Sequence, residues 1–218
     1  MDLETVLVVI LAIAALAAMG WLTWISIQSA LQARLLFRAG RRFGQASTIH
    51  GRPVVSEPLA LWGHTDLLWY KVKFQELRGL GRNRSWTTVG EEEKMAGFHV
   101  DDGGRPIEVE DTPTEVQSAG SRTEYDGESG CLTFGQWGGS SRTVIRFLRV
   151  GPRVTVLGRL ERSGETDVIV RDPTVGLLLS PNPPDRAAWT EIAKAVGGFL
   201  VVAAGWGLLI YAYSGWKG

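Results

Sequence analysis

The sequence has little cysteine and histidine, and it has no excess of charge of either sign. Its 218 residues include one cysteine, Cys131, so an internal disulfide and a multi-cysteine zinc cage are both excluded. Lys and Arg together number 23, as do Asp and Glu, which leaves no basic excess for binding the phosphates of nucleic acid. Neither a disulfide scaffold nor a nucleic-acid-binding protein is therefore expected.

Two long runs without charged side chains lie near the two ends. The first extends from Thr5 to Ala33 and the second from Ala195 to Trp216. A helix of about 22 residues rises roughly 33 Å, enough for a hydrocarbon core of about 30 Å. Apolar runs in soluble cores usually stop earlier, and a signal peptide would need basic residues where Asp2 and Glu4 stand. We predict transmembrane helices over residues 5–27 and 192–213.

Arginines follow the first predicted span directly. Arg34, Arg38, Arg41 and Arg42 lie in a basic juxtamembrane helix that we predict over residues 28–43. Basic flanks stay in the cytoplasm, so we expect an integral membrane protein with the middle domain cytoplasmic and both termini outside. These four arginines are predicted to contact anionic lipid headgroups, which makes the bilayer itself a partner.

The middle of the chain, residues 44–180, has the pattern of an all-β domain. Residues 69–75 alternate bulky and polar side chains, as a half-buried strand does. Residues 154–160 are followed across Ser163-Gly164 by residues 167–170, the pattern of a hairpin. About seven short strands at this spacing predict a small antiparallel barrel or sandwich, of which an OB-like barrel is one form.

Two further segments have distinct compositions. Residues 112–137 are rich in Gly, Ser, Thr and Glu, and we predict either an insertion across one face of the barrel or a long loop. Residues 181–190 contain three prolines, which predicts a stiff linker into the second span.

No catalytic, cofactor or metal site is predicted. The three histidines, His50, His64 and His99, form no ligand pair such as H-x-x-x-H. Cys131 lies in a polar segment without a flanking base that would activate its thiol. A hydrolase that uses His99, Asp101 or Cys131 remains as a third hypothesis beside the two functions given below.

Two acidic groups are explained by local structure. Asp101-Asp102 precedes two glycines and predicts a turn, and residues 91–93, all glutamates, predict a solvated strand end. The loop that carries Arg78, Arg82 and Arg84 beside Trp86 combines cations with an aromatic ring. That combination can bind a phosphate, a headgroup or an acidic partner, although an ordinary solvent-exposed hairpin tip fits it as well.

The middle domain resembles the GIDE domain of the Mulan-type mitochondrial RING ubiquitin ligases. The resemblance covers roughly Ala46 to Ser180, and a span on each side matches too. It is carried by strand and turn residues: Ile49 and Gly51, Glu57-Pro58-Leu59, Trp69-Tyr70-Lys71-Val72 with Trp86, Phe98-His99-Val100-Asp101-Asp102, Ile107-Glu108-Val109, Val150-Gly151, and residues 154–158. The family places this domain in the intermembrane space, whereas the arginines here indicate the cytoplasm.

Ubiquitin-ligase activity does not follow from this resemblance. The ligases use a Cys- and His-rich RING, and one cysteine cannot supply its zinc ligands. The arginine-rich, lysine-poor composition indicates a RING-less bacterial relative. The sequence thus predicts a membrane-tethered binding or scaffolding module with a membrane or cytoplasmic protein partner. The alternative is a non-catalytic subunit of a ligase-like or protease complex.

Overall fold

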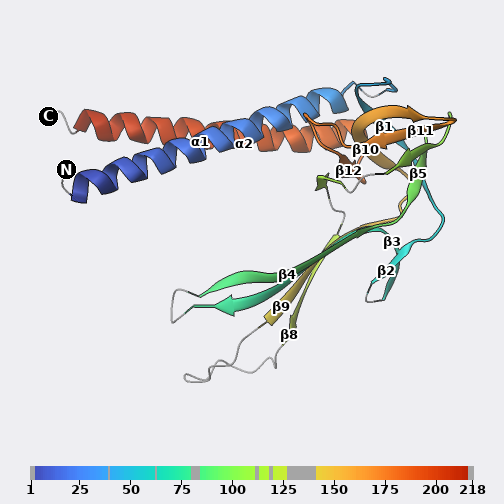
Figure 1. The fold of residues 1–218 in the computed structure, drawn as a ribbon, viewed down its shortest axis with the longest axis horizontal. Helices are drawn as coiled ribbons and strands as arrows, with labels where there is room; N and C mark the ends of the chain where they lie inside the picture. The colour runs from blue at the N-terminus through green and yellow to red at the C-terminus, as the bar shows by residue number, and fades with distance from the viewer. Residues whose placement is uncertain are drawn as a thin grey trace.

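The computed structural model describes residues 3–38, 40–61, 63–79, 84–110, 113–117, 120–126 and 141–215. It is mostly β, with a closed five-stranded barrel, a projecting sheet and two long helices (Figure 1). The helices are α1 (Leu3–Leu36) and α2 (Pro184–Gly215). The strands are β1 (Ala46–Val55), β2 (Leu59–Leu61), β3 (His64–Arg78), β4 (Ser85–Met95), β5 (Phe98–Asp101), β6 (Ile107–Val109), β7 (Glu115–Val116), β8 (Gly120–Asp126), β9 (Ser141–Arg149), β10 (Val154–Ser163), β11 (Thr166–Val170) and β12 (Leu178–Ser180).

The barrel closes because β1 pairs with two strands in turn. Its first half is antiparallel to β10 and its second half to β5, and the ring continues through β6 and β11 back to β10. The change of partner falls at Gly51, where a Cβ would overlap the carbonyl oxygen of Asp101. The sequence therefore needs glycine at this crossing. The β6–β11 pair is parallel, whereas the other pairs in the ring are antiparallel.

The core of the barrel follows from the alternation of its strands. In β6, Ile107 and Val109 are buried and Glu108 between them is exposed. The same period of two applies to β5, where Phe98 and Val100 point inward. Burying each such side chain contributes about 1.5–3 kcal/mol. The barrel and the start of β3 share one cluster: Ile49, Leu68, Trp69, Phe98, Val100, Ile107, Val109, Val116, Leu148, Val154, Val156, Leu160, Ile169, Leu177 and Leu179.

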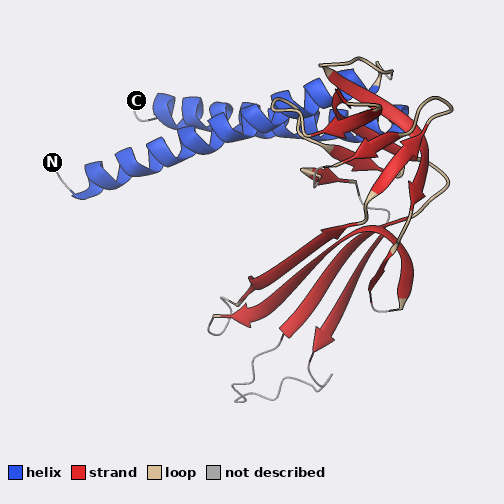
Figure 2. Ribbon diagram, turned by 45° about the vertical axis from the view of Figure 1, so that its right-hand side comes forward, coloured by secondary structure: helices blue, strands red, loops and turns tan. Residues whose placement is uncertain are grey.

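A second sheet projects from the barrel. It has the order β4–β3–β9–β8, and β2 pairs with the start of β3. Its own buried cluster is small and lies near the barrel, at Leu67, Tyr70, Val72 and Ile145. Figures 1 and 2 both show the sheet leaving the barrel on the side where the two helices leave it, with the sheet and the helices diverging.

The two helices form an antiparallel pair. Gly198 packs so closely on α1 that a Cβ would overlap the hydroxyl oxygen of Ser26, and Gly205 faces Met19 one contact further along. These two glycines thus allow the helices to approach, as small residues do in membrane helix pairs. Both helices are long and apolar enough to cross a membrane by length and composition.

The barrel end of α1 packs on the barrel. Ser29, Gln32 and Leu36 are buried, and the Gln32 Nε2 donates to the carbonyl oxygen of Val175 at 2.9 Å. Further from the barrel, large apolar side chains are exposed on both helices: Ile10, Ile13, Leu16, Trp21, Trp24 and Ile27, and Val196, Phe199, Leu200, Val201, Trp206, Leu208, Ile210 and Tyr211.

Three predicted segment boundaries differ from the structure. Helix α1 ends at Leu36 rather than at residue 43, because the Thr48 hydroxyl binds the Leu35 carbonyl and Gly40 adopts a φ of 151°. Helix α2 begins at Pro184, inside the predicted linker 181–190, since proline suits the first helical position. The polar segment 112–137 includes β7 and β8, because backbone pairing does not require apolar side chains.

Candidate functional site on the barrel

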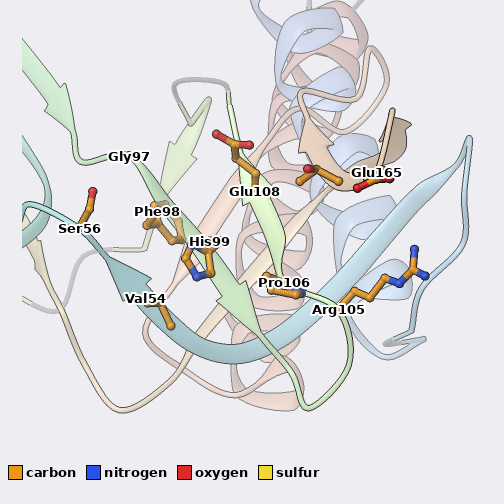
Figure 3. A pocket seen from close by; sticks show the side chains of 10 residues that line it. Val54, Ser56, Gly97, Phe98, His99, Arg105, Pro106, Glu108 and Glu165 are labelled. Carbon is orange, nitrogen blue, oxygen red and sulfur yellow. The ribbon is translucent and has the colours of Figure 1, made fainter.

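A pocket lies on the outer face of the barrel, and its floor is a row of side chains across three strands. Val54 of β1 is paired with His99 of β5, which is paired with Glu108 of β6. Their chain neighbours point into the core, so these three side chains point outward (Figure 3).

The pocket has a volume of about 520 Å³ and is completed by residues of the segments that connect the strands. The β10–β11 turn contributes Glu165 and Thr166, and the β5–β6 connection contributes Arg105. The parallel β6–β11 pairing, with Asp167 opposite Ile107, brings that turn beside Glu108. A local hairpin could not bring these groups together, because they are far apart in the sequence.

The charged groups of the pocket are available to a ligand. Among the described residues, the side chains of His99, Glu108, Glu165 and Arg105 form no hydrogen bond or ion pair with other side chains or with the backbone. Val54 is 39% exposed and supplies an apolar contact at one end of the row. Two carboxylates, one guanidinium and an imidazole lie beside one apolar side chain. This combination favours a polar ligand that carries at least one cation.

The pocket lacks the geometry of nucleophilic catalysis. Ser56 and Thr166 line it, but no hydrogen bond connects either hydroxyl to His99 in the described parts of the chain. A nucleophile needs a base within hydrogen-bond reach. No group of three or more His, Cys, Asp or Glu side chains that could hold a metal ion occurs within the described ranges.

Arg41 connects the β5–β6 connection to β11 at one end of this pocket. Its guanidinium is paired with Asp102, lies 3.4 Å from the carboxylate of Asp167, and donates to the carbonyl oxygen of Arg105 at 2.6 Å. Asp167 is only 2% exposed. Hydrogen bonding to Asp102 raises the pKa of Arg41, and the same contact lowers the pKa of Asp102. Arg41, which was predicted to contact lipid, is thus occupied within the barrel.

The other three juxtamembrane arginines are placed differently. Arg34, Arg38 and Arg42 are exposed, and their guanidinium groups form no ion pair with any described residue. Contact between these three side chains and lipid headgroups stays a prediction.

The predicted hairpin between β3 and β4 is confirmed, with Arg78 opposite Ser85. Arg78 is paired with Glu76 at 3.0 Å, and Arg84 is exposed without an ion pair to the described residues. Trp86 lies under the guanidinium of Arg142 of β9, 4.3 Å from the ring centroid. Sequence reasoning missed Arg142, because only the β3–β9 pairing brings it here. Arg82 lies outside the described residues.

His50 and His64 have separate partners. His50 Nδ1 lies 2.9 Å from the Thr155 hydroxyl, and burial lowers the pKa of His50. His64 stacks on Phe147 and lies 3.0 Å from an Arg149 nitrogen.

The acidic groups have roles that differ in part from the prediction. The turn at Asp101-Asp102 is confirmed, because the amides of Gly103 and Gly104 donate to the two carboxylates at 2.9 and 3.1 Å. The glutamates of β4 are more than a solvated strand end. They form ion pairs with lysines: Glu91 and Glu93 with Lys71 of the neighbouring strand β3, and Glu92 with Lys94 of β4 itself. Cys131 lies outside the described residues.

Sequence reasoning did not select Glu108 or Glu165. The alternation in residues 107–109 would have shown that Glu108 points outward, but nothing in the sequence pairs it with the β10–β11 turn. Comparison of the chain with protein-family models, curated proteins and solved structures finds no match. The properties of the pocket therefore rest on its own residues.

Proposed function

We propose that this chain is a membrane-tethered binding module. In this proposal α1 and α2 cross the bilayer, the barrel stands at the membrane surface, and the pocket around His99 and Glu108 receives a segment of a partner protein. The observation that carries the proposal is the sharp division of the helix pair into a part packed on the barrel and a part that exposes apolar side chains.

The level of that division is the same on both helices. Ser26 meets Gly198 and Met19 meets Gly205, so each step along α1 corresponds to a step back along α2. Ile27 is therefore close to the level of Gly197 and Val196, where large exposed apolar side chains become frequent on α2. Nearer the barrel, Phe37 and Trp189 are also exposed, and their rings pack on each other. A common level on two helices is what one flat membrane interface requires.

A cytoplasmic location of the barrel is supported by Arg34, Arg38 and Arg42, which lie between the apolar part of the helix pair and the barrel. The test is labelling of Ser56→Cys, in a Cys131→Ser background, with a membrane-impermeant maleimide in intact bacteria. We expect labelling only after the cells are permeabilised. Labelling in intact cells would place the barrel outside and overturn this part of the proposal.

The pocket chemistry supports a partner segment with a basic side chain. The carboxylates of Glu108 and Glu165 are unpaired within the described chain, and Val54 can contact the aliphatic stem of a lysine or arginine. Charge-assisted hydrogen bonds to carboxylates are about twice as strong as neutral ones.

A photo-crosslinking residue at Val54 tests the binding site. The control position is Thr174, an exposed residue of the β11–β12 connection whose carbonyl oxygen accepts from Gln28 of α1 and which does not line the pocket. We expect a crosslinked protein from position 54 that is lost in the double variant Glu108→Gln and Glu165→Gln. Equal crosslinking from position 174, or no effect of the double variant, would contradict the proposed site.

The identity of the crosslinked chain decides between the two roles. A ligase or protease present in a one-to-one ratio would make this chain the non-catalytic subunit of an enzyme complex. A partner without enzymatic activity would favour the scaffolding role. The hydrolase alternative predicts that His99→Ala and Asp101→Ala abolish function in cells, whereas the binding role allows Asp101→Ala to retain it.

The tip of the projecting sheet is a second candidate contact surface, formed by Arg78, Arg84 and Trp86. One observation favours lipid headgroups over a protein partner there, because the sheet leaves the barrel on the same side as the helices (Figures 1 and 2). A photo-crosslinker at Arg84 should then react with lipid. Crosslinks to protein alone would assign the tip to a partner instead.

A further inference from the structure

An apolar groove of about 520 Å³ runs between α1 and α2 beside the barrel. Two stripes at helical spacing form it, Ala30, Ala33 and Phe37 on α1 and Ile192, Ala195, Val196 and Phe199 on α2. The floor is low because Ala33 and Ala195 are small and buried, and Phe37 and Phe199 stand exposed at its sides.

One end of this groove is charged and the other is apolar. Arg34 and Arg38 line the end nearer the barrel; Arg34 lies in the last turn of α1, and Arg38 lies in the turn that follows, where its amide donates to the Leu35 carbonyl oxygen. Phe37 packs edge-on against Trp189 at this end, with ring centroids 6.2 Å apart. The opposite end opens beside Phe199, where the exposed apolar surface of the helices begins.

We propose that this groove is a binding site for an anionic phospholipid of the surrounding leaflet. Its phosphate lies between Arg34 and Arg38, and one acyl chain follows the groove past Ala30 and Ala195 toward Phe199. Arginine suits this role because its planar guanidinium binds phosphate oxygens through two parallel hydrogen bonds.

Charge complementarity and direction select a lipid over other occupants. A second copy of this chain would bring the same arginines against each other across a two-fold axis, which is repulsive. A lipid instead has its anionic group and its apolar chain in the order in which the groove presents arginines and apolar walls. The inference rests on the membrane placement proposed above and adds a defined stoichiometric site to it.

Native mass spectrometry of the full chain in detergent tests the site. The probes are phosphatidylglycerol and phosphatidylcholine with identical acyl chains, offered at equal concentration. We expect one phosphatidylglycerol retained per chain in preference to phosphatidylcholine, and roughly thirtyfold weaker retention in the double variant Arg34→Gln and Arg38→Gln.

Two further variants separate a groove from general surface charge. Ala30→Trp fills the groove at an exposed position and leaves both arginines, so we expect it to lose the bound lipid. Arg52→Gln with Arg153→Gln makes the same charge change on exposed barrel positions, and we expect it to retain the lipid.

Equal retention of both lipids by the unsubstituted chain would overturn the proposal. So would undiminished retention by Ala30→Trp, which would indicate plain electrostatic attraction, or a lipid-free dimer crosslinked through positions 37 and 199. Membrane fractionation of the same variants is measured in parallel. A variant that loses the lipid but stays in the membrane fraction tests the groove alone. A chain that is absent from the membrane fraction would contradict the membrane placement itself.

Discussion

The barrel and the projecting sheet are built from similar strands but are stabilised in different ways. The barrel strands enclose a shared core in which Val100, Ile107 and Ile169 are fully buried. Beyond Val72, β3 has no buried residue, and β4 has none along its length. This outer part of the sheet depends on backbone pairing and on exposed ion pairs. The exposed ion pairs contribute little to the free energy of unfolding. A rigid barrel thus carries a sheet whose outer part can open locally.

The largest consequence concerns amide hydrogen exchange. Amides of β10 and β11 should exchange only when the barrel unfolds, whereas amides near Gln75 and Thr88 should exchange through local opening. We expect a difference of about a thousandfold or more in protection, measured by exchange mass spectrometry of the full chain in detergent. Equal protection in both regions would show that the sheet has a support that its side chains do not reveal.

Truncation of a buried side chain should also affect the two regions differently. The difference in unfolding free energy should be slightly smaller than the difference expected from hydrogen exchange. Ile169→Ala removes a fully buried side chain of the barrel, and we expect it to lower the free energy of unfolding by about 3 kcal/mol. Phe74→Ala is the matched change in the sheet, where the ring is 40% exposed, and it should cost less than about 1 kcal/mol. Denaturant titration in detergent measures both. Similar losses would contradict the comparison.

Two glycines provide a third and weaker contrast. At Gly51 an added methyl group would overlap the Asp101 backbone at the point where the barrel closes, so Gly51→Ala should cost about 2 kcal/mol. At Gly90 of β4 the nearest atom would be 3.4 Å away, on the Phe74 ring, so Gly90→Ala should change stability by less than about 0.5 kcal/mol. The same denaturant titration measures the change in unfolding free energy for both variants.

The smallest expected effect is a pH dependence of the barrel. Burial lowers the pKa of His50 in the folded state, so the unfolded state binds a proton more readily. The free energy of unfolding therefore has its full value above the pKa of His50 in the unfolded state, about 6.5. It decreases by less than about 1 kcal/mol as the pH falls toward 5.5. His50→Gln should remove this portion of the decrease. An unchanged pH profile in that variant would assign the effect to other groups.

Sequence patterns predicted local features well where each depends on near neighbours. The β10–β11 hairpin and the β3–β4 hairpin are confirmed, since each follows from alternation and turn residues within about twenty positions. The helix boundaries were less predictable. Thr48 ends α1 from another element, and α2 begins at Pro184 inside a segment whose prolines indicated a linker.

The candidate pocket could not be predicted, because it depends on contacts between segments that are far apart in the sequence. Glu108 and Glu165 meet because β6 and β11 are parallel neighbours, and parallel pairing has no short-range signal in the sequence. The partners of Arg41 within the barrel could not be predicted for this reason either. Its position after an apolar run indicates lipid, but Asp102 and Asp167 approach it only in the folded barrel.

The sequence by itself determined two helices of membrane-spanning length and a β-rich middle, because hydropathy and alternation are properties of neighbouring residues. Only the tertiary structure decided how the barrel closes at Gly51, which charges are paired, and where the pocket and the groove lie. These features arise between segments that are distant in the chain, and their positions are fixed by packing and pairing of the whole fold.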